Sequence, residues 1–256
     1  MDLEGAKLLI ADSGNSFQCR VANFFRELKW SVLMSPYYVD SSTDKTRELD
    51  LIAEAAYSVK RVWIGPPINI RVRLFIECKY ITQGAVFWLD SMDAARAHEW
   101  IYSRTPFVRG NIFSEEHHYL TQGEQVAKLF ASERHKGEEN DPIFRAVNQC
   151  LNGFIHSRDR ETLVPYAEGE DLIELRYPII ICSAFGDFFR ASVRNATDPV
   201  AIKNNFLLEV DYAYVAVEGA TREYSLVDFL EFGQLNAFID SLEHEIEALS
   251  KQVGDN

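Results

Sequence analysis

One short strand pattern constrains this chain more than any other feature of its sequence. The segment Leu74-Phe-Ile-Glu-Cys-Lys79 is mostly apolar and carries Glu77 and Lys79 two residues apart. Side chains alternate between the two faces of a strand, so Glu77 and Lys79 are expected to project together while Cys78 points to the opposite, buried face. Placing two ionisable groups on one face of an apolar strand carries a desolvation cost that a structural role seldom offsets. We therefore interpret the pair as part of a chemical site.

A second apolar segment supplies another carboxylate. Asp50 stands in the run Arg47-Glu-Leu-Asp-Leu-Ile-Ala53, and in a neighbouring strand it could meet Glu77 and Lys79. Two carboxylates that converge form an oxygen-ligand site for Mg²⁺ or Mn²⁺. A lysine beside the metal can orient or deprotonate a water, or stabilise the charge that builds up on phosphorus. The set therefore suits metal-assisted phosphodiester hydrolysis.

The hydrophobic pattern predicts helices and strands around these segments. Apolar residues recur at helical spacing over residues 16–29, which predicts a helix there. Strands are expected at 30–39, 49–57, 59–64, 71–80, 85–89, 107–113 and 206–217. Further helices are expected from the cap Asp90-Ser91 to about Ser103, at 123–133, at 141–155, and from Ser225 to about Lys251. The pair Gly186-Asp187 predicts a hairpin between strands at 172–184 and 188–193.

The order helix, strand, Asp in an apolar strand and ExK in an apolar strand resembles the PD-(D/E)xK restriction-endonuclease-like superfamily, including its Mrr-like branches. The resemblance covers roughly residues 14–90. It implies an α/β fold with a restriction-endonuclease-like mixed sheet of four or five strands flanked by helices. We expect this core in residues 1–135, with residues 136–256 as an acidic α+β extension packed on it. The resemblance also implies that Asp50, Glu77 and the Cys78 carbonyl hold Mg²⁺ or Mn²⁺, and that Lys79 is the catalytic lysine.

Two departures from the family pattern bear on activity. Many relatives carry a metal-coordinating Glu on the first helix, where this chain has Gln18, and we expect Gln18 to hold outer-shell water instead. Asp50 precedes Glu77 by 27 residues, which is longer than usual. We expect an extra hairpin around Gly65-Pro66-Pro67 to fill this spacing.

The net charge of −13 argues, for the chain as a whole, against a nucleic-acid-binding protein. The charge is uneven, however: residues 1–135 carry 16 basic and 17 acidic side chains, and the remainder carries 10 and 22. The predicted hairpin arms supply candidates for phosphate contact, namely Lys60, Arg61, Arg71 and Arg73. The acidic half is expected to form a solvated surface, or a face that repels DNA or meets a basic protein partner.

Other candidates are expected to be structural. The four cysteines are far apart, without zinc or redox spacing, and we expect reduced thiols in a cytoplasmic protein. The adjacent His117 and His118 cannot form an i, i+4 metal pair on a helix, so we expect them at the surface. The sequence shows no export signal and no apolar stretch of membrane-spanning length, so no membrane partner is expected.

These observations predict a divalent-metal-dependent nuclease acting on DNA, with RNA left open, in bacterial restriction, repair or phage defence. Cutting both strands would favour a homodimer. One alternative is the same fold with impaired chemistry, serving as a binding or scaffold subunit, which Gln18 and the acidic half favour. The other is an unrelated protein in which ExK is coincidental, and it predicts that the Asp50 and Glu77 carboxylates lie well apart.

Overall fold

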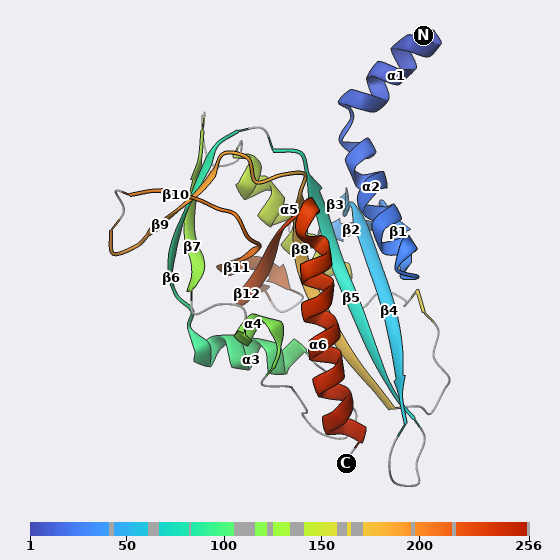
Figure 1. Cartoon of the computed structure of the whole chain (residues 1–256), viewed down its shortest axis with the longest axis vertical. Coiled ribbons are helices and arrows are strands. Elements are labelled where there is room, and N and C mark those ends of the chain that lie inside the picture. The colour runs from blue at the N-terminus through green and yellow to red at the C-terminus, as the bar shows by residue number, and fades with distance from the viewer. Residues whose placement is uncertain are drawn as a thin grey trace.

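The central strands of the fold carry the segments singled out above. The computed structural model describes residues 1–256 except 41–43, 61–66, 82, 105–115, 122–124, 134–140, 158–162, 165–170, 196–197, 217–218 and 255–256. Within these described residues, ten strands form one mixed sheet in the order β1-β4-β5-β8-β12-β11-β7-β6-β9-β10. Helices cover both faces of this sheet (Figure 1). The predicted α/β class, a mixed sheet flanked by helices, is confirmed.

The chain begins with two helices, α1 (Leu3–Asp12) and α2 (Gly14–Glu27). Helix α1 projects from the body of the molecule, whereas α2 lies against the sheet (Figure 1). The predicted apolar stripe of α2 is buried at Phe17, Val21 and Phe25. Lys29 then adopts a positive φ of 67°, a left-handed conformation that turns the chain into the first strand.

Three antiparallel strands follow, and a fourth strand joins them in parallel. These are β1 (Ser31–Met34), β4 (Leu51–Val59), β5 (Ile68–Lys79) and β8 (Asp171–Cys182). Strand β5 pairs with β4 on one side and with β8 over its whole length on the other. The ribbon of β2 (Tyr37–Asp40) and β3 (Lys45–Glu48) stands outside this sheet.

Helix α5 (Pro142–Ser157) connects the two halves of the chain. Its N-terminus forms as expected: Pro142 is the first helical residue, and the Asp141 carboxylate accepts the backbone N–H groups of Ile143 and Phe144 at 2.7 and 3.1 Å. The ring of Phe154 packs edge-on against Phe75 of β5 at 5.3 Å. Helix α5 therefore covers the face of β5 to which the odd-numbered side chains point.

Helix α6 (Leu235–Gly254) covers the opposite face. Its Glu245 accepts a hydrogen bond from Tyr177 of β8. Tyr177 is the register partner of Leu74 in β5, so the side chains of Tyr177 and Leu74 point to the same face of the sheet, the even-numbered face of β5. The remaining elements are β6 (Ala85–Ser91), α3 (Ala94–Arg104), α4 (His118–Thr121), β7 (Gln125–Ser132), β9 (Phe188–Ser192), β10 (Val200–Ala201), β11 (Phe206–Ala216), β12 (Gly219–Glu231) and a 3₁₀ turn (Phe232–Gln234). None of the described helices is both long and apolar enough to cross a membrane.

Three sequence expectations are wrong. Residues 125–132 form strand β7, not a helix, because they pair with β6 and β11 and bury Val126 and Ala127 in the sheet. The predicted hairpin at Gly186-Asp187 does not form, since β8 pairs with β5 and β12 while β9 pairs with β6 and β10. The last helix begins at Leu235, because residues 225–230 are a fully buried part of β12.

Other boundaries differ or stay open. The expected strand at 30–39 is split into β1 and β2 at Ser35, which has a φ of 51°. Residues 107–113 and most of 59–64, expected as strands, lie outside the described residues. The domain boundary at residue 135 stays a prediction, and strands from both sides of it belong to the one sheet.

Candidate active site

Asp50 and Glu77 meet where β4 begins and β5 ends. The β4–β5 register ends at Leu51 opposite Ile76, so Asp50 stands one position further along, opposite Glu77. The Asp50 carboxylate accepts the backbone N–H of Cys78 at 2.7 Å. Glu77 is buried, with an exposed fraction of 2%. The two acids thus occupy facing positions of neighbouring strands.

Lys79 completes the cluster. Its Nζ donates to Glu77 Oε1 at 2.5 Å and to Gln149 Oε1 of α5 at 2.8 Å. Glu77 and Lys79 therefore share one face of β5, as the strand alternation predicts. The contact with Gln149 could not be predicted from the sequence, because nothing near a single amide on an amphipathic helix indicates that Lys79 is its partner.

The second carboxylate oxygen of Glu77 is a buried acceptor. Among the described residues, Glu77 Oε2 has no hydrogen-bond partner. Burial and the neighbouring Asp50 carboxylate together raise the pKa of Glu77 to about 8, against the opposing effect of Lys79. Burial also raises the pKa of Asp50, while the Cys78 N–H opposes this. A divalent cation near this oxygen would stabilise both ionised acids, and Mg²⁺ or Mn²⁺ as that cation stays a prediction.

Gln18 braces the same site from α2. Its Nε2 donates to the Asp50 carbonyl at 2.6 Å and to Ser35 Oγ at 3.2 Å. The amide thus holds the backbone at the beginning of β4, and its predicted contact with outer-shell water stays a prediction. The Cys78 carbonyl as a metal ligand also stays a prediction. Burial raises the pKa of the Cys78 thiol well above its usual range, which disfavours a thiolate there.

Two of the four basic candidates cannot contact a phosphate as predicted. Arg71 and Arg73 are only 2% and 1% exposed, and their Nε atoms face the two oxygens of Glu54 at 3.2 Å each. Arg73 also pairs with Glu174 of β8 at 3.2 Å. Both arginines are buried in ion pairs, so the expectation that they are surface cations is wrong. Lys60 is exposed, and its phosphate contact stays a prediction.

Arg61, the remaining basic candidate, lies outside the described residues.

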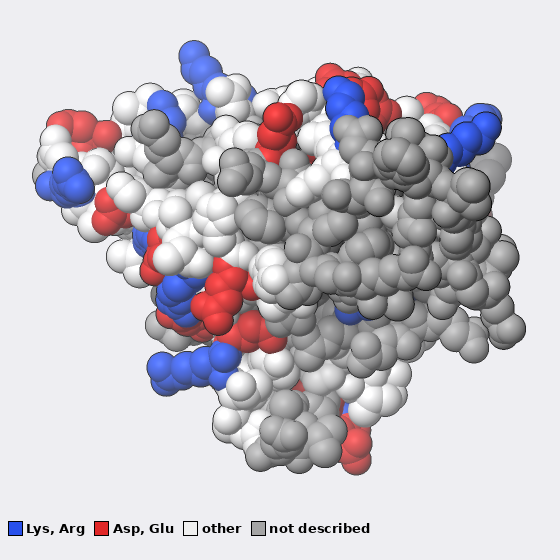
Figure 2. Space-filling model, turned by 90° about the horizontal axis from the view of Figure 1, so that it is seen from below, with Lys and Arg blue, Asp and Glu red and all other residues white. Residues whose placement is uncertain are grey.

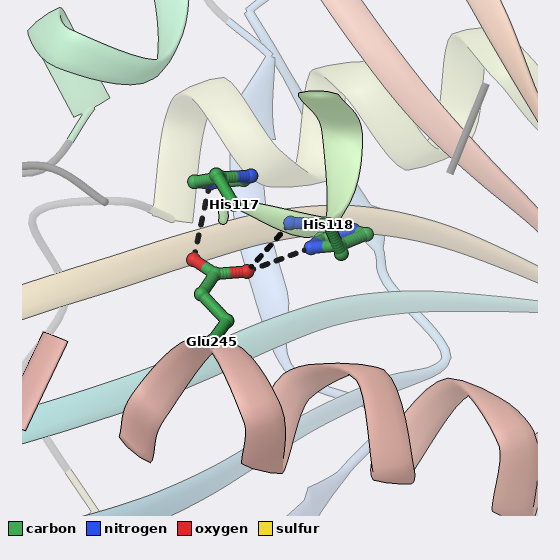
Figure 3. A group of neighbouring side chains, drawn as sticks. All are labelled: His117, His118 and Glu245. Atoms are coloured by element: carbon green, nitrogen blue, oxygen red, sulfur yellow. Dashed lines mark hydrogen bonds and ion pairs between the residues drawn. The ribbon is translucent and has the colours of Figure 1, made fainter. Parts of the chain in front are cut away.

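His117 and His118 are buried, which corrects the expectation of surface residues. Figure 3 shows Glu245 reaching from α6 toward both imidazoles. One Glu245 oxygen lies 3.3 Å from His117 Nε2 and the other 3.0 Å from His118 Nδ1. His118 Nε2 faces Asp228 at 3.3 Å. The three side chains of His117, His118 and Glu245 bring one ligand atom each within 4.8 Å of one another, so this group could hold a metal ion.

The hydrogen bonds of this group favour an ion network over a metal site. Burial alone would lower the pKa of His118, but the Asp228 and Glu245 carboxylates outweigh it and raise the pKa to about 9. An imidazolium at His118 has no lone pair for a metal. Burial lowers the pKa of His117 to about 4, and its Nδ1 accepts the Tyr119 N–H at 3.2 Å, which leaves the Nε2 proton for Glu245. The N–H groups of the two imidazoles therefore already satisfy the Glu245 and Asp228 oxygens.

Comparison of the chain with protein-family models, with curated proteins and with solved structures finds no match.

Proposed function

We propose that this protein is a divalent-metal-dependent nuclease of restriction-endonuclease-like fold that hydrolyses phosphodiester bonds, with DNA as the first substrate to test. The observation that carries the proposal is the meeting of Asp50 and Glu77 at facing strand positions, with Lys79 bonded to Glu77 on the same strand face. Asp50 precedes Glu77 by 27 residues in the sequence and Lys79 follows Glu77 by two, and together they form a combination that suits metal-assisted phosphodiester hydrolysis.

The arrangement of elements supports the same proposal. Helix α2, strand β1, strand β4 with Asp50 directly before it, and strand β5 with Glu77 come in the order that the resemblance implies. They form a mixed sheet with β8, and α5 closes the face that carries Lys79. A carboxylate pair at the ends of two central strands is held by the whole sheet, which suits a site that must keep its ligands in fixed positions.

Each residue has a defined part in the proposed reaction. The Asp50 and Glu77 carboxylates would hold the cation, and the Cys78 N–H fixes the orientation of Asp50. When bound, Mg²⁺ or Mn²⁺ supplies the Lewis acidity that polarises the scissile phosphate. Lys79, held between Glu77 and Gln149, would orient the attacking water and stabilise negative charge on phosphorus. Gln18 maintains the backbone at Asp50.

Cleavage assays with matched variants test this proposal. The purified full chain is incubated with labelled single-stranded and double-stranded DNA and with RNA, in Mg²⁺, Mn²⁺ or EDTA. We expect metal-dependent cleavage that falls at least about 100-fold in Asp50→Asn, Glu77→Gln and Lys79→Ala. Asp187→Asn and Lys251→Ala change exposed residues of the same types and should cut like the wild type. Absence of cleavage on every substrate, or full activity in the three site variants, would overturn the proposal.

A second candidate function is a metal-binding scaffold with the same fold and impaired chemistry. The engagement of Gln18 favours it, because the Nε2 that replaces a ligating carboxylate group is committed to Asp50 O and Ser35 Oγ. In that case Mn²⁺ should raise the melting temperature of the wild type but not of Asp50→Asn, while no substrate is cut. Turnover above that of the Lys79→Ala variant would exclude this candidate.

A further inference from the structure

A polar groove adjoins the candidate active site. The groove has a volume of about 680 Å³, and Gln149, the partner of Lys79, is part of its lining. Its walls come from the β2–β3 ribbon, α5, β11 and the beginning of β12. The size is that of a site for a small ligand or for a short stretch of a polymer. A molecule seated in the groove would therefore contact Gln149, which accepts a hydrogen bond from Lys79.

One wall of the groove is a polar stripe of helix α5. Arg145, Asn148, Gln149 and Asn152 recur at positions i, i+3, i+4 and i+7, so they lie along one side of the helix. The opposite side of α5 is buried against the sheet. Within the described part of the chain, the side-chain amides of Asn148 and Asn152 make no hydrogen bond. These amides offer donors and acceptors to a ligand in the groove.

The facing walls are aromatic. Tyr38, Tyr212 and Tyr214 line the groove, and the Tyr38 ring is stacked at 5.9 Å on His156, another lining residue. Tyr38 is only 5% exposed, yet its hydroxyl has no hydrogen-bond partner among the described residues. Burial raises the pKa of this phenol, and the carboxylate of Glu77 contributes to the rise.

Aromatic rings beside amides and a guanidinium match the chemistry of an unpaired nucleotide. Bases stack on aromatic side chains, amides bond to the base edges that pairing would otherwise occupy, and Arg145 can bind a phosphate. A duplex offers neither a free base face nor a free pairing edge. Duplex binding also relies on broad basic surfaces. On the face that Figure 2 presents, seen from below Figure 1, acidic and basic side chains are intermixed among the described residues.

We propose that this groove binds an unpaired nucleotide of the substrate strand beside the scissile phosphate, so that the protein selects single-stranded nucleic acid. The inference rests on the proposed function for the neighbouring phosphate. In this arrangement a tyrosine ring of the groove stacks on the base, Asn148 and Asn152 bond to its edge, and the exposed Arg145 binds a neighbouring phosphate.

Binding without cleavage tests the groove separately from the chemistry. Fluorescence anisotropy of the full chain is measured with a labelled single-stranded DNA oligonucleotide, its duplex and the RNA of the same sequence, in EDTA and in Ca²⁺. We expect the better single strand to bind at least about tenfold more tightly than the duplex, and the double variant Asn148→Ala/Asn152→Ala to lose about tenfold in affinity. Asn204→Ala, an exposed asparagine outside this groove, is the matched control and should bind like the wild type.

The outcomes separate the two proposals. Single-strand binding that depends on the two asparagines, in a protein that cuts nothing, supports the groove and refutes the nuclease. Equal or tighter binding of the duplex, with metal-dependent cutting intact, refutes the groove and leaves the nuclease. Loss of binding in Glu77→Gln to the same extent as in the double variant would also overturn the groove, because Glu77 lies outside its lining. A thermal melt of the double variant confirms that it is folded, and the partial exposure of both asparagines predicts that it is.

Discussion

Replacing Glu77 with Gln should change how the stability of the protein depends on pH. The pKa of Glu77 rises from 4.5 to about 8, so the folded state holds this proton more tightly than the unfolded state does. The contribution of Glu77 to the free energy of unfolding is therefore greatest at low pH and decreases between about pH 4.5 and pH 8. Glutamine keeps the shape of the neutral acid and cannot ionise, so the variant should lack this decrease.

The size of the effect follows from the pKa shift. Each pKa unit corresponds to about 1.4 kcal/mol, which gives an upper limit of about 5 kcal/mol for the change from pH 4.5 to pH 8. Because Asp50 and Glu77 interact, the pair shares the titration, and we expect about 2–4 kcal/mol for the Glu77 part. The variant should thus gain stability over the wild type as the pH rises.

Urea denaturation followed by circular dichroism measures this difference. The free energy of unfolding of wild type and Glu77→Gln is determined at several values from about pH 5 to about pH 9 in EDTA. Titrations common to both proteins, such as those of the buried histidines, cancel in the difference. A difference that stays constant within about 0.5 kcal/mol across this range would refute the buried, protonated Glu77. Excess Mg²⁺ should stabilise the wild type above pH 8 but not the variant, and no effect of Mg²⁺ on either would refute the carboxylate as a ligand.

Three further substitutions test buried parts of the fold, each by the free energy of unfolding in urea. Glu54→Gln leaves two buried arginines facing a neutral group and should cost about 3–5 kcal/mol, whereas a cost below about 1 kcal/mol would contradict the buried ion pairs. The pKa of His118 is raised to about 9, so its pairing with Asp228 and Glu245 contributes fully to the free energy of unfolding below about pH 6.5. This contribution is lost as the pH rises through 9, and His118→Gln should abolish the pH-dependent loss. Gly153→Ala places a Cβ 2.7 Å from Leu49 Cδ1 and should cost about 1–3 kcal/mol despite the helix preference of alanine, and an unchanged midpoint would contradict this packing.

Local periodicity predicts the elements that carry the candidate site. Helices α2 and α5 and strands β4 and β5 follow from apolar spacing and from caps such as Asp141, because each of these signals lies within one element. The shared face of Glu77 and Lys79 follows from strand alternation. Residues 125–132 and 225–231 could not be assigned in this way, since pairing with distant strands decides their conformation.

Partners that are far apart in the sequence account for the other errors. Arg71 and Arg73 have the sequence signature of surface cations, and only the approach of Glu54 and Glu174 explains their burial. His118 likewise meets Glu245 across 127 residues. Gln149 was missed for the same reason. The burial of a charged residue in a strand thus cannot be predicted until its opposing carboxylates are known. The burial of an apolar residue can be predicted from its own side chain.

The parallel pairing of β5 with β8 has a consequence for any attempt to shorten the chain. A fragment that ends near residue 135 would turn β5 into an open sheet edge, with its backbone N–H and C=O groups free to pair with other molecules. It would also lack α5, so the ring of Phe75 and the side chain of Lys79 would lose their covering partners. Such a fragment should aggregate instead of folding. The acidic half of the sequence therefore supplies both the strand that pairs with β5 and the helix that covers Lys79.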